Sequence, residues 1–441
     1  MERSVAFLVY KSWRPARRKN DSFDGLSNIG AYMLIDKLKR SGIEVDFCSV
    51  DSAKKYKLVL ISFTSALDIL AFGRVVINHP DWKKRKFTTV GGGFGMQNPM
   101  AVKQWLDYSW FGRGENDIID IVKANGHYES ISMMDTNKPK VSKIAQSKEI
   151  YPYGFNYPNN AHGKDQYKET IMGCPNKCFY CHYSWARKHI DKGKHFELSL
   201  YASSQELDMF NVEQYDPKVA QLTAGLDGYS ERLRKIVNRQ NTNQDIKDFI
   251  LGVSQRTQIT GKALFLRLYN IIGYETETIE DWEEFKNIII EIEPKIKKRI
   301  LLTTHSTPLR PSPATPMAFA ELQPITHLKQ PTGIPVLKET DNLLWFTSRF
   351  EEGEFARLEM LLVERFTEQY RDLFTMIVTN KKFNSLPTSK KWYYVKQKYN
   401  LTDLYREYDV TEQIPSWFLE GYKSMDAIKK LRLQMKRKMN D

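Results

Sequence analysis

Three of the four cysteines in this 441-residue chain stand within eight positions of one another. Cys174, Cys178 and Cys181 form a CxxxCxxC run directly after the apolar stretch 167–173. Soft thiolates at this spacing can bind one metal centre from a single loop, and an iron–sulfur cluster is the natural occupant. Three ligands leave one iron of a four-iron cluster without a protein donor, so that iron can bind a substrate or cofactor directly.

A structural zinc site is the alternative for the same cysteines, with His182 or His189 as the fourth ligand. Zinc sites usually pair two CxxC-type hooks, and the sequence has no second hook, which disfavours zinc. The remaining cysteine, Cys48, lies on an alternating segment and is predicted to be a buried structural thiol. This cysteine usage excludes a disulfide scaffold and fits a reducing compartment.

Length and composition predict two or three domains of ordinary soluble character. A chain of 441 residues exceeds one ordinary core, and 41% hydrophobic with 27% charged residues is a typical balance. No stretch approaches the ~18 uninterrupted apolar residues of a membrane span, and the first residues lead into a strand-like segment rather than a signal peptide. We therefore expect a cytoplasmic protein with no membrane partner.

The first ~145 residues alternate between strand and helix patterns, which predicts a parallel sheet covered on both faces. Short β-rich runs occupy 5–9, 43–50, 58–62 and 87–90. Apolar residues recur at helical spacing between the first two runs, from Ala31 to Leu38, and Gly42 is expected to end that helix. A glycine run, Gly91 to Gly95 interrupted by Phe94, follows the fourth strand, and Asn98 and Pro99 open the next helix. Ligands bind at this carboxyl edge in open α/β sheets.

The cysteine run resembles that of the radical S-adenosylmethionine (SAM) superfamily, whose hallmark is this spacing with an aromatic residue just before the last cysteine. Tyr180 is that residue here. The resemblance implies that Cys174, Cys178 and Cys181 hold a four-iron, four-sulfur (4Fe-4S) cluster and that SAM chelates the fourth iron through its amino and carboxylate groups. It also implies that Tyr180 flanks the adenine and that an external electron donor, such as a flavodoxin or ferredoxin, reduces the cluster.

Residues 4–125 resemble the cobalamin-binding-type domain that precedes many radical SAM barrels. The similarity rests on the order of four landmarks, at 28–42, 61–64, 90–93 and 111–115. It implies that two loops cradle the cobalamin tail, and these loops contain Ser62, Thr64, Gly91, Gly92 and Gly93. The Asp-x-His-x-x-Gly motif that supplies a cobalt ligand in other cobalamin proteins is absent, and some domains of this type have lost cobalamin. The sequence therefore leaves both alternatives open, a domain that binds cobalamin and one that does not.

Methylthiotransferases are the neighbouring family that the cysteine count disfavours. They carry a second cluster on three cysteines of the amino-terminal domain, whereas this chain has only Cys48 there.

Residues 146–330 are expected to form a partial radical SAM barrel with its chemistry at the carboxyl ends of the strands. The segment 222–233 resembles the family segment that contacts the SAM ribose and carboxylate, which implies roles for Asp227, Ser230 and Arg232. The segment 268–278 resembles a later strand and loop, although Tyr274 replaces the usual Pro-Gly. Both segments also fit a plain strand followed by a capped helix. The family's Gly-Gly-Glu element is not located.

Two residues near the last barrel strand are candidate substrate contacts. His305 follows an apolar run and precedes a proline-rich segment that resembles the exit loop over the substrate cavity. A structural histidine is the alternative. Arg310 lies in that loop as a candidate anion contact, with a surface salt bridge as the alternative.

Residues 331–441 change character and are predicted to be a helical region packed on the barrel. The net charge of +13 is concentrated in a loop at 11–19, in the mixed basic and aromatic segment 390–399, and in a tail at 429–438. Such patches favour a nucleic-acid partner, while a lysine-rich solvated surface is the alternative.

The sequence therefore predicts an α/β protein with a Rossmann-like domain (1–145), a partial radical SAM barrel (146–330) and a helical carboxyl-terminal region (331–441). By resemblance, it cleaves SAM at a 4Fe-4S cluster to a 5′-deoxyadenosyl radical that modifies an unactivated carbon, with methyl transfer if cobalamin is bound. The alternatives are a cobalamin-independent radical modification of nucleic acid or a metabolite, and a non-catalytic iron–sulfur protein that binds nucleic acid.

Overall fold

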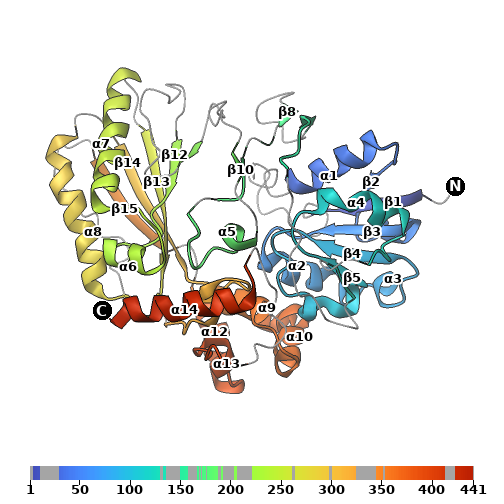
Figure 1. The fold of residues 1–441 in the computed structure, drawn as a ribbon. Coiled ribbons are helices and arrows are strands. Elements are labelled where there is room, and N and C mark those ends of the chain that lie inside the picture. Colours follow the sequence, from blue (N-terminus) through green and yellow to red (C-terminus); the bar gives the residue numbers. More distant parts are fainter. Residues whose placement is uncertain are drawn as a thin grey trace.

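The computed structural model describes residues 3–9, 29–129, 133–135, 149–156, 166–167, 169, 171–174, 176–186, 190–191, 203–205, 221–260, 264–296, 300–323, 344–350, 353–412 and 423–440. These residues form two larger, parallel-dominated sheets, helices packed on them, and a helical region that contacts both parts (Figure 1). Among them, no helix is long and apolar enough to cross a lipid bilayer. The predicted basic loop 11–19 and the predicted domain boundaries at 145/146 and 330/331 lie outside the described residues, so these boundaries remain predictions.

The first sheet has six strands in the order β2-β1-β3-β4-β5-β6, and all neighbours are parallel except β5 and β6. The strands are β1 (Arg3–Leu8), β2 (Asp46–Phe47), β3 (Tyr56–Ser62), β4 (Thr88–Gly92), β5 (Tyr108–Trp110) and β6 (Met133–Asp135). Alternate residues of β1 belong to two different cores, with Val5 and Phe7 in one and Ala6 and Leu8 in the other. The sheet is therefore buried on both faces, which explains its continuous apolar runs.

Helices cover each face of this sheet. The helices α1 (Ile29–Arg40) and α4 (Ile118–Lys123) pack on one face, while α2 (Ala66–Val76), α3 (Pro80–Lys83) and the 3-10 helix η5 (Pro99–Trp105) pack on the other. The short 3-10 helices η4 (Ala53–Lys55) and η6 (Gly114–Asn116) join neighbouring elements. The predicted helix near 31–38 is confirmed, and Gly42 after it has a φ of +76°, the left-handed conformation that commonly follows a helix.

The second sheet has five parallel strands in the order β11-β12-β13-β14-β15. Its strands are β11 (Ser203–Gln205), β12 (Gln221–Gly225), β13 (Leu264–Ile272), β14 (Ile300–Pro308) and β15 (Leu344–Phe350). Helices α7 (Asn243–Thr260) and α8 (Ile279–Ile292) bury one face of β12, β13 and β14, and the 3-10 helix η9 (Glu293–Lys295) extends α8. Within the described residues the strands form an open sheet rather than a closed ring.

Short elements lie between the two sheets in the sequence. They comprise the antiparallel pair β7 (Phe155–Asn156) and β8 (Gln166–Tyr167), the antiparallel pair β9 (Ile171–Met172) and β10 (Ile190–Asp191), and α5 (His182–Ala186). The connection from β9 to α5 carries the three clustered cysteines.

The carboxyl-terminal region is helical after β15 and joins the two halves of the molecule. Its elements are α9 (Glu354–Glu364), η12 (Glu368–Tyr370), α10 (Arg371–Thr379), α11 (Lys381–Asn384), α12 (Thr388–Lys398), α13 (Thr402–Tyr405) and α14 (Met425–Asn440). Helix α9 packs against α2, and the Asn98 amide donates to the carbonyls of Glu364 and Phe366 at 3.4 and 3.2 Å. Helix α14 packs on α6 (Glu231–Ile236) and on the 3-10 helix η10 (Pro316–Phe319).

The predicted α/β class with a helical carboxyl-terminal region is confirmed, although three details differ from the sequence analysis. The strand expected over 43–50 shrinks to Asp46–Phe47, which pairs only with β1 at the sheet edge. The helix after Asn98 is 3-10, with the Asn98 side chain accepting from the Met100 N–H at 3.2 Å. Strand β15 was not anticipated in the region 331–441, and it extends the second sheet.

Arg365 is a fully buried side chain at the carboxyl end of α9 that joins two other segments, the chain around η10 and the chain around α13. Its guanidinium donates to the carbonyls of Leu404 and Arg406 at 2.9 and 3.1 Å, and to those of Ala318 and Ala320 at 2.9 and 2.8 Å. Burial lowers the pKa of this side chain to about 9. Buried carbonyl groups need donors, so Arg365 fixes the path of the chain after β14.

We predict that Arg365→Leu lowers the free energy of unfolding by roughly 3–5 kcal/mol, because it removes four hydrogen bonds to buried carbonyls. Urea denaturation followed by circular dichroism measures the change. The matched control is Arg74→Leu, which breaks the more exposed ion pair with Glu359 and should cost less than about 1 kcal/mol. Equal losses for the two variants would contradict this assignment.

Candidate functional site

The cysteine loop between β9 and α5 is fixed to two other segments by its backbone. The Phe179 N–H donates to the Val237 carbonyl at the end of α6 at 2.9 Å, and the Phe179 carbonyl accepts from the Met317 N–H of η10 at 3.0 Å. The Asn238 amide donates to the carbonyls of Asn176 and Lys177 at 3.2 and 3.1 Å. The loop is therefore held against the helix that follows β12 and against the segment that follows β14.

The tip of the loop is tightened from inside. Lys177 has a φ of +50°, a left-handed conformation that turns the chain between the first and second cysteines. The Trp185 indole N–H of α5 donates to the Cys178 carbonyl at 2.7 Å, and the Cys181 N–H donates to the same carbonyl at 3.2 Å. These contacts make a rigid turn around Cys178.

The three cysteines of the loop differ in exposure, with Cys178 buried and Cys174 and Cys181 half-buried. Cys178 is buried, and burial raises the pKa of its thiol to about 12, against an opposing effect of the Arg239 guanidinium. Burial also raises the pKa of Cys181, which interacts electrostatically with Cys174. Buried thiols are easier to ionise when a metal binds the thiolate, so these donors fit a soft metal centre.

No group of three His, Cys, Asp or Glu side chains in the described part of the chain is arranged to hold a single metal ion. A four-iron cluster makes a different demand from a single ion. Each of its cysteines binds a different iron, so the thiols need to surround a cluster rather than one point. The cluster role of the three cysteines therefore remains a prediction.

Asp227 and Arg239 lie beside Cys178 at the carboxyl end of β12. Asp227 has a φ of +60°, and its Oδ2 is 3.5 Å from Arg239 Nε. The Asp227 carboxylate packs directly against Gly225. Any residue with a Cβ atom at position 225 would place that atom 2.7 Å from Asp227 Oδ2. The Tyr274 hydroxyl donates to the Asp227 carbonyl at 2.6 Å, and burial raises the pKa values of Tyr274 and Tyr180 well above their ordinary value. Of the predicted SAM contacts, Tyr180 and Asp227 thus lie together near the cysteine loop.

Ser230 and Arg232 have other partners. The Ser230 hydroxyl accepts from the Leu233 N–H at 3.1 Å, which caps α6, and it also donates to Asp281. Arg232 forms an ion pair with Asp281 at 2.7 Å and donates to the Thr276 carbonyl at 2.8 Å. In this structure both side chains therefore connect α6 to the beginning of α8, the plain capped-helix arrangement.

The candidate substrate contacts lie on and after β14. His305 is buried on this strand, with its ring centroid 5.8 Å from that of Tyr269 on β13. Arg310 follows the strand, and its Nη1 lies 3.4 Å from the Met360 sulfur. These contacts do not test a role in substrate binding, so both roles remain predictions.

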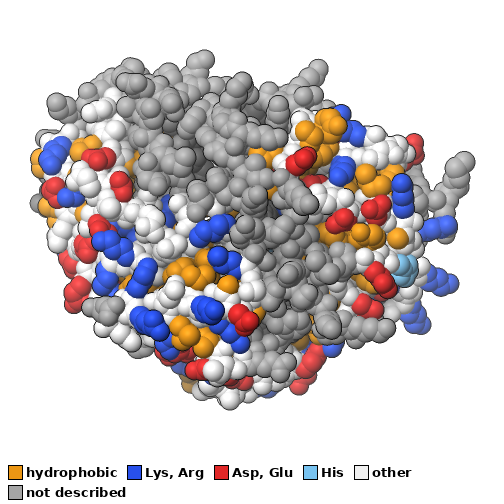
Figure 2. Space-filling model, in the orientation of Figure 1, with side chains coloured by type: hydrophobic (Ala, Val, Ile, Leu, Met, Phe, Trp, Pro, Cys, Tyr) orange, Lys and Arg blue, Asp and Glu red, His pale blue; other side chains and the backbone are white. Residues whose placement is uncertain are grey.

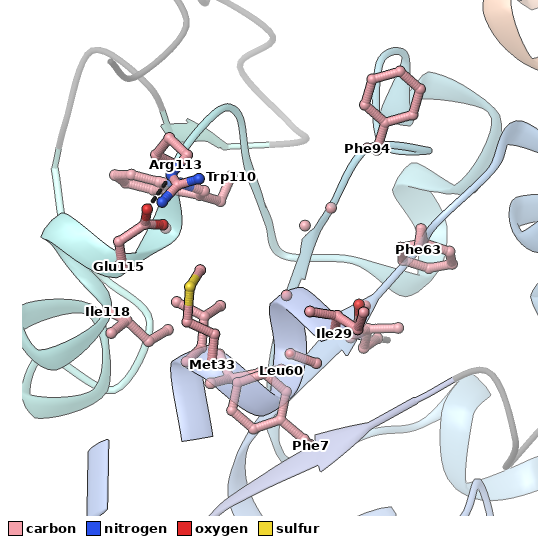
Figure 3. A pocket seen from close by; sticks show the side chains of 18 of the residues that line it. Phe7, Ile29, Met33, Leu60, Phe63, Phe94, Trp110, Arg113, Glu115 and Ile118 are labelled. Atoms are coloured by element: carbon pink, nitrogen blue, oxygen red, sulfur yellow. Dashed lines mark ion pairs between the residues drawn. The ribbon is translucent and has the colours of Figure 1, made fainter. Parts of the chain in front are cut away.

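A cavity of about 610 Å³ opens at the carboxyl edge of the first sheet (Figure 3). Four of the five predicted cobalamin contacts line it, namely Ser62, Thr64, Gly92 and Gly93. Gly91 faces away, because a Cβ atom there would lie 2.8 Å from the Leu106 side chain in the opposite core. Most of the remaining wall is apolar, and the volume is that of a small-molecule site.

One wall of this cavity is charged. Arg113 makes a bidentate pair with Glu169 at 2.6 and 2.7 Å and also contacts Glu115, as Figure 3 shows for the latter pair. The Trp110 indole N–H is buried on the same wall and has no hydrogen-bond partner within the described residues. Residues 111–115 are part of the cobalamin-domain resemblance, but that resemblance assigned no functional role to Arg113. Glu169 was not predicted, because its ion pair with Arg113 joins residues 56 positions apart.

No protein-family model matches this chain. An uncharacterized protein of Methanocaldococcus jannaschii is 21% identical over 356 residues, which cover 67% of this chain and 77% of that protein. Among solved structures, the apo form of the cobalamin-dependent S-adenosylmethionine radical enzyme OxsB aligns with a TM-score of 0.44 and 11% identity, covering 65% of this chain and 51% of OxsB. OxsB with aqua-cobalamin and S-adenosylmethionine bound gives 0.44 and 12%, covering 65% and 52%. The chain thus spans about half the length of OxsB, and its activity has to be inferred from its own residues.

Glu277 is a half-buried carboxyl group in the loop between β13 and α8. Its Oε2 accepts from the Gly273 and Tyr274 backbone N–H groups, the second at 3.2 Å. Burial raises its pKa to about 8, so the group is largely protonated at neutral pH in the folded protein. The unfolded chain loses this proton near pH 4.3. Stability from this group is therefore complete at low pH and is lost as the pH rises towards 8.

We predict that the free energy of unfolding falls by about 1.4 kcal/mol per pH unit between about pH 5 and 8 because of Glu277. Glu277→Gln should remove that slope, since an amide does not titrate. Urea titrations at each pH unit measure it, and the difference between the two proteins cancels groups that they share. Glu280→Gln, in the first turn of α8, is the control and should keep the wild-type slope. Parallel profiles for wild type and Glu277→Gln would show that Glu277 is not the titrating group.

Proposed function

We propose that this protein is a radical SAM enzyme whose Cys174, Cys178 and Cys181 hold a 4Fe-4S cluster. The observation that supports it most is the position of the CxxxCxxC loop, which is fixed to the end of α6 and to η10. It lies with Asp227 and Arg239 at the carboxyl end of a parallel strand. Open α/β sheets bind their ligands at that edge.

When bound, the cluster would supply one electron to the SAM sulfonium, so that the S–C5′ bond breaks to release methionine and a 5′-deoxyadenosyl radical, which would take a hydrogen atom from an unactivated substrate carbon and become 5′-deoxyadenosine. The protein contributes binding, orientation and exclusion of water. In that turn Cys178 is buried and Tyr180 is half-buried against the core, which limits the access of solvent. The Asp227 carboxylate and the Arg239 guanidinium offer an acceptor and a donor beside that turn, where the polar groups of SAM need partners.

The cavity of the first sheet supports a second cofactor. Its apolar wall and its glycines leave room for the cobalamin tail. A Cβ atom added at Gly92 would have its nearest neighbour, the Trp110 side chain, 3.7 Å away, so this position tolerates a side chain that enters the cavity. With cobalamin bound, the expected reaction is methyl transfer to the substrate carbon. An external one-electron donor such as a flavodoxin or ferredoxin would reduce the cluster.

We predict that anaerobically reconstituted protein carries about four irons per chain and, once reduced, cleaves SAM to 5′-deoxyadenosine. Serine at Cys174, Cys178 or Cys181 should abolish both properties. Iron analysis, visible absorbance and chromatography of the products measure them. Cys48→Ser is the matched control, because Cys48 is also a buried thiol but lies next to β1, where its N–H donates to Phe7.

Two outcomes would contradict the proposal. A stable zinc complement without iron absorbance would replace the cluster with a structural metal site. A full cluster without SAM cleavage would favour a non-catalytic iron–sulfur protein.

We predict that wild-type protein retains hydroxocobalamin in equilibrium dialysis and that Gly92→Trp loses it while keeping the wild-type iron content. The indole would occupy the cavity, because the Gly92 Cβ direction opens into it. Gly93 is unsuitable for this test, since a side chain there would overlap the Phe63 carbonyl. Gly353→Trp is the control, because a Cβ atom at Gly353 meets nothing within 4 Å. Failure of the wild type to retain cobalamin would contradict the proposed methyl transfer, but it would not contradict SAM cleavage at the cluster.

A further inference from the structure

The carboxyl-terminal helices carry an unusually one-sided charge. Residues 373–402 contain six lysines and no Asp, Glu or Arg, and these lysines are Lys381, Lys382, Lys390, Lys391, Lys396 and Lys398. All but the half-buried Lys391 are exposed. Lys and Arg side chains gather over α14 and just beneath it on the face shown in Figure 2. A surface of this kind attracts polyanions.

A second cavity lies beside the carboxyl-terminal half of α12, separate from the cavity of the first sheet. Its volume is about 710 Å³, and it is lined by α12, by α13 with the loop before it, by Glu354 and by Glu321 and Leu322. Three aromatic side chains, Trp392, Tyr399 and Tyr405, form much of its wall. The Trp392 and Tyr405 ring centroids are 6.2 Å apart. The cavity thus offers flat apolar faces directly beside a basic helix.

The polar groups of this cavity include one that lacks a partner. The Tyr405 hydroxyl is buried without a hydrogen-bond partner among the described residues, although buried tyrosine hydroxyls usually have one. The backbone holds the residue in place, because the Leu322 N–H donates to the Tyr405 carbonyl at 2.8 Å. Tyr405 is therefore held at a fixed position in the cavity wall, and among the described residues its buried hydroxyl has a hydrogen bond still to make.

Lys396 is the cation of this cavity that has no carboxylate partner. It forms no ion pair within the described residues, and its Nζ lies 5.9 Å from the Trp392 ring centroid. Arg406 also lines the cavity, but it pairs with Glu412 at 2.9 Å and with Asp403 at 2.8 Å. An anionic group entering beside Trp392 would therefore meet Lys396 first.

We propose that the cavity takes a base of a single-stranded nucleic acid, stacked on Trp392, with Lys396 beside the nearest phosphate and the other lysines of α12 contacting phosphates farther along the strand. Aromatic faces with interleaved cations are the usual means of binding single-stranded nucleic acids. The distance from Lys390 to Lys398 along α12 is about 12 Å, so these lysines suit more than one phosphate. This inference does not depend on the cluster or on cobalamin.

The test is fluorescence anisotropy with a labelled 12-nucleotide single-stranded RNA at several salt concentrations. We expect a steep fall of affinity with salt in the wild type, because each neutralised phosphate releases counterions. Joint replacement of Lys390, Lys391 and Lys396 by alanine should reduce the slope of log affinity against log salt by about 2, at about 0.7 per phosphate contact. Lys286→Ala on α8 is the charge control and should leave the slope unchanged.

Two further variants test the cavity itself. Trp392→Ala should weaken RNA binding about 10- to 100-fold at constant salt slope, whereas Tyr393→Ala should change it less than about 2-fold. Tyr393 is the matched control, since it is 64% exposed on the same helix and does not line the cavity. Tyr405→Phe should weaken binding about 5-fold with an unchanged melting temperature, because its hydroxyl makes no bond that folding would lose.

Three results would overturn the proposal. One is wild-type RNA affinity in both Trp392→Ala and Tyr405→Phe, which would make the surface purely electrostatic. Another is equal affinity for polyglutamate, which would point to an acidic protein instead. The third is competition by AMP or CMP as effective as that by the unlabelled RNA, which would assign the cavity to free nucleotides.

Discussion

Backbone carbonyl groups in buried loops need hydrogen-bond donors, and in this protein buried arginines supply many of them. Arg365 serves four carbonyls, Arg234 serves those of Gly228, Tyr229 and Asn241, and Arg357 serves those of Gln323 and Leu309. Each guanidinium presents five donors in a rigid fork, so one side chain can fix two segments of irregular chain. The loops at the carboxyl edge of the second sheet therefore have defined paths despite their lack of regular structure.

The cysteine loop depends on this constraint indirectly. It is held by Val237, Asn238 and Met317, which belong to segments that Arg234 and Arg365 keep in place. Arg239 extends the same arrangement, since its Nη2 donates to the Gly225 carbonyl at 3.0 Å while its Nε faces Asp227. The position of the loop is therefore fixed by neighbouring segments, while contacts within it fix the turn around Cys178.

The sequence predicted those features that depend on local order. The helix ending near Gly42 and the α/β alternation follow from short-range patterns, and the structure has both. The glycine run after β4 was harder to interpret, because successive residues of a strand face opposite sides, so Gly91 faces a core and Gly92 a cavity. Partners that meet through tertiary contacts, such as Arg239 with Asp227 or Arg113 with Glu169, leave no local pattern.

The pairing of Arg113 with Glu169 has a consequence for how this protein can change during evolution. The Glu169 carboxylate also accepts from the Tyr151 N–H at 2.8 Å, so one side chain forms part of the cavity wall and holds the chain just before β7. Losing Arg113 leaves the Glu169 and Glu115 carboxylates together without their cation, a cost of several kcal/mol, whereas losing Glu169 leaves Arg113 paired with Glu115. Neutral drift at Arg113 is therefore blocked unless the carboxylates change with it, and relatives that keep this architecture should retain Arg113 more strictly than Glu169.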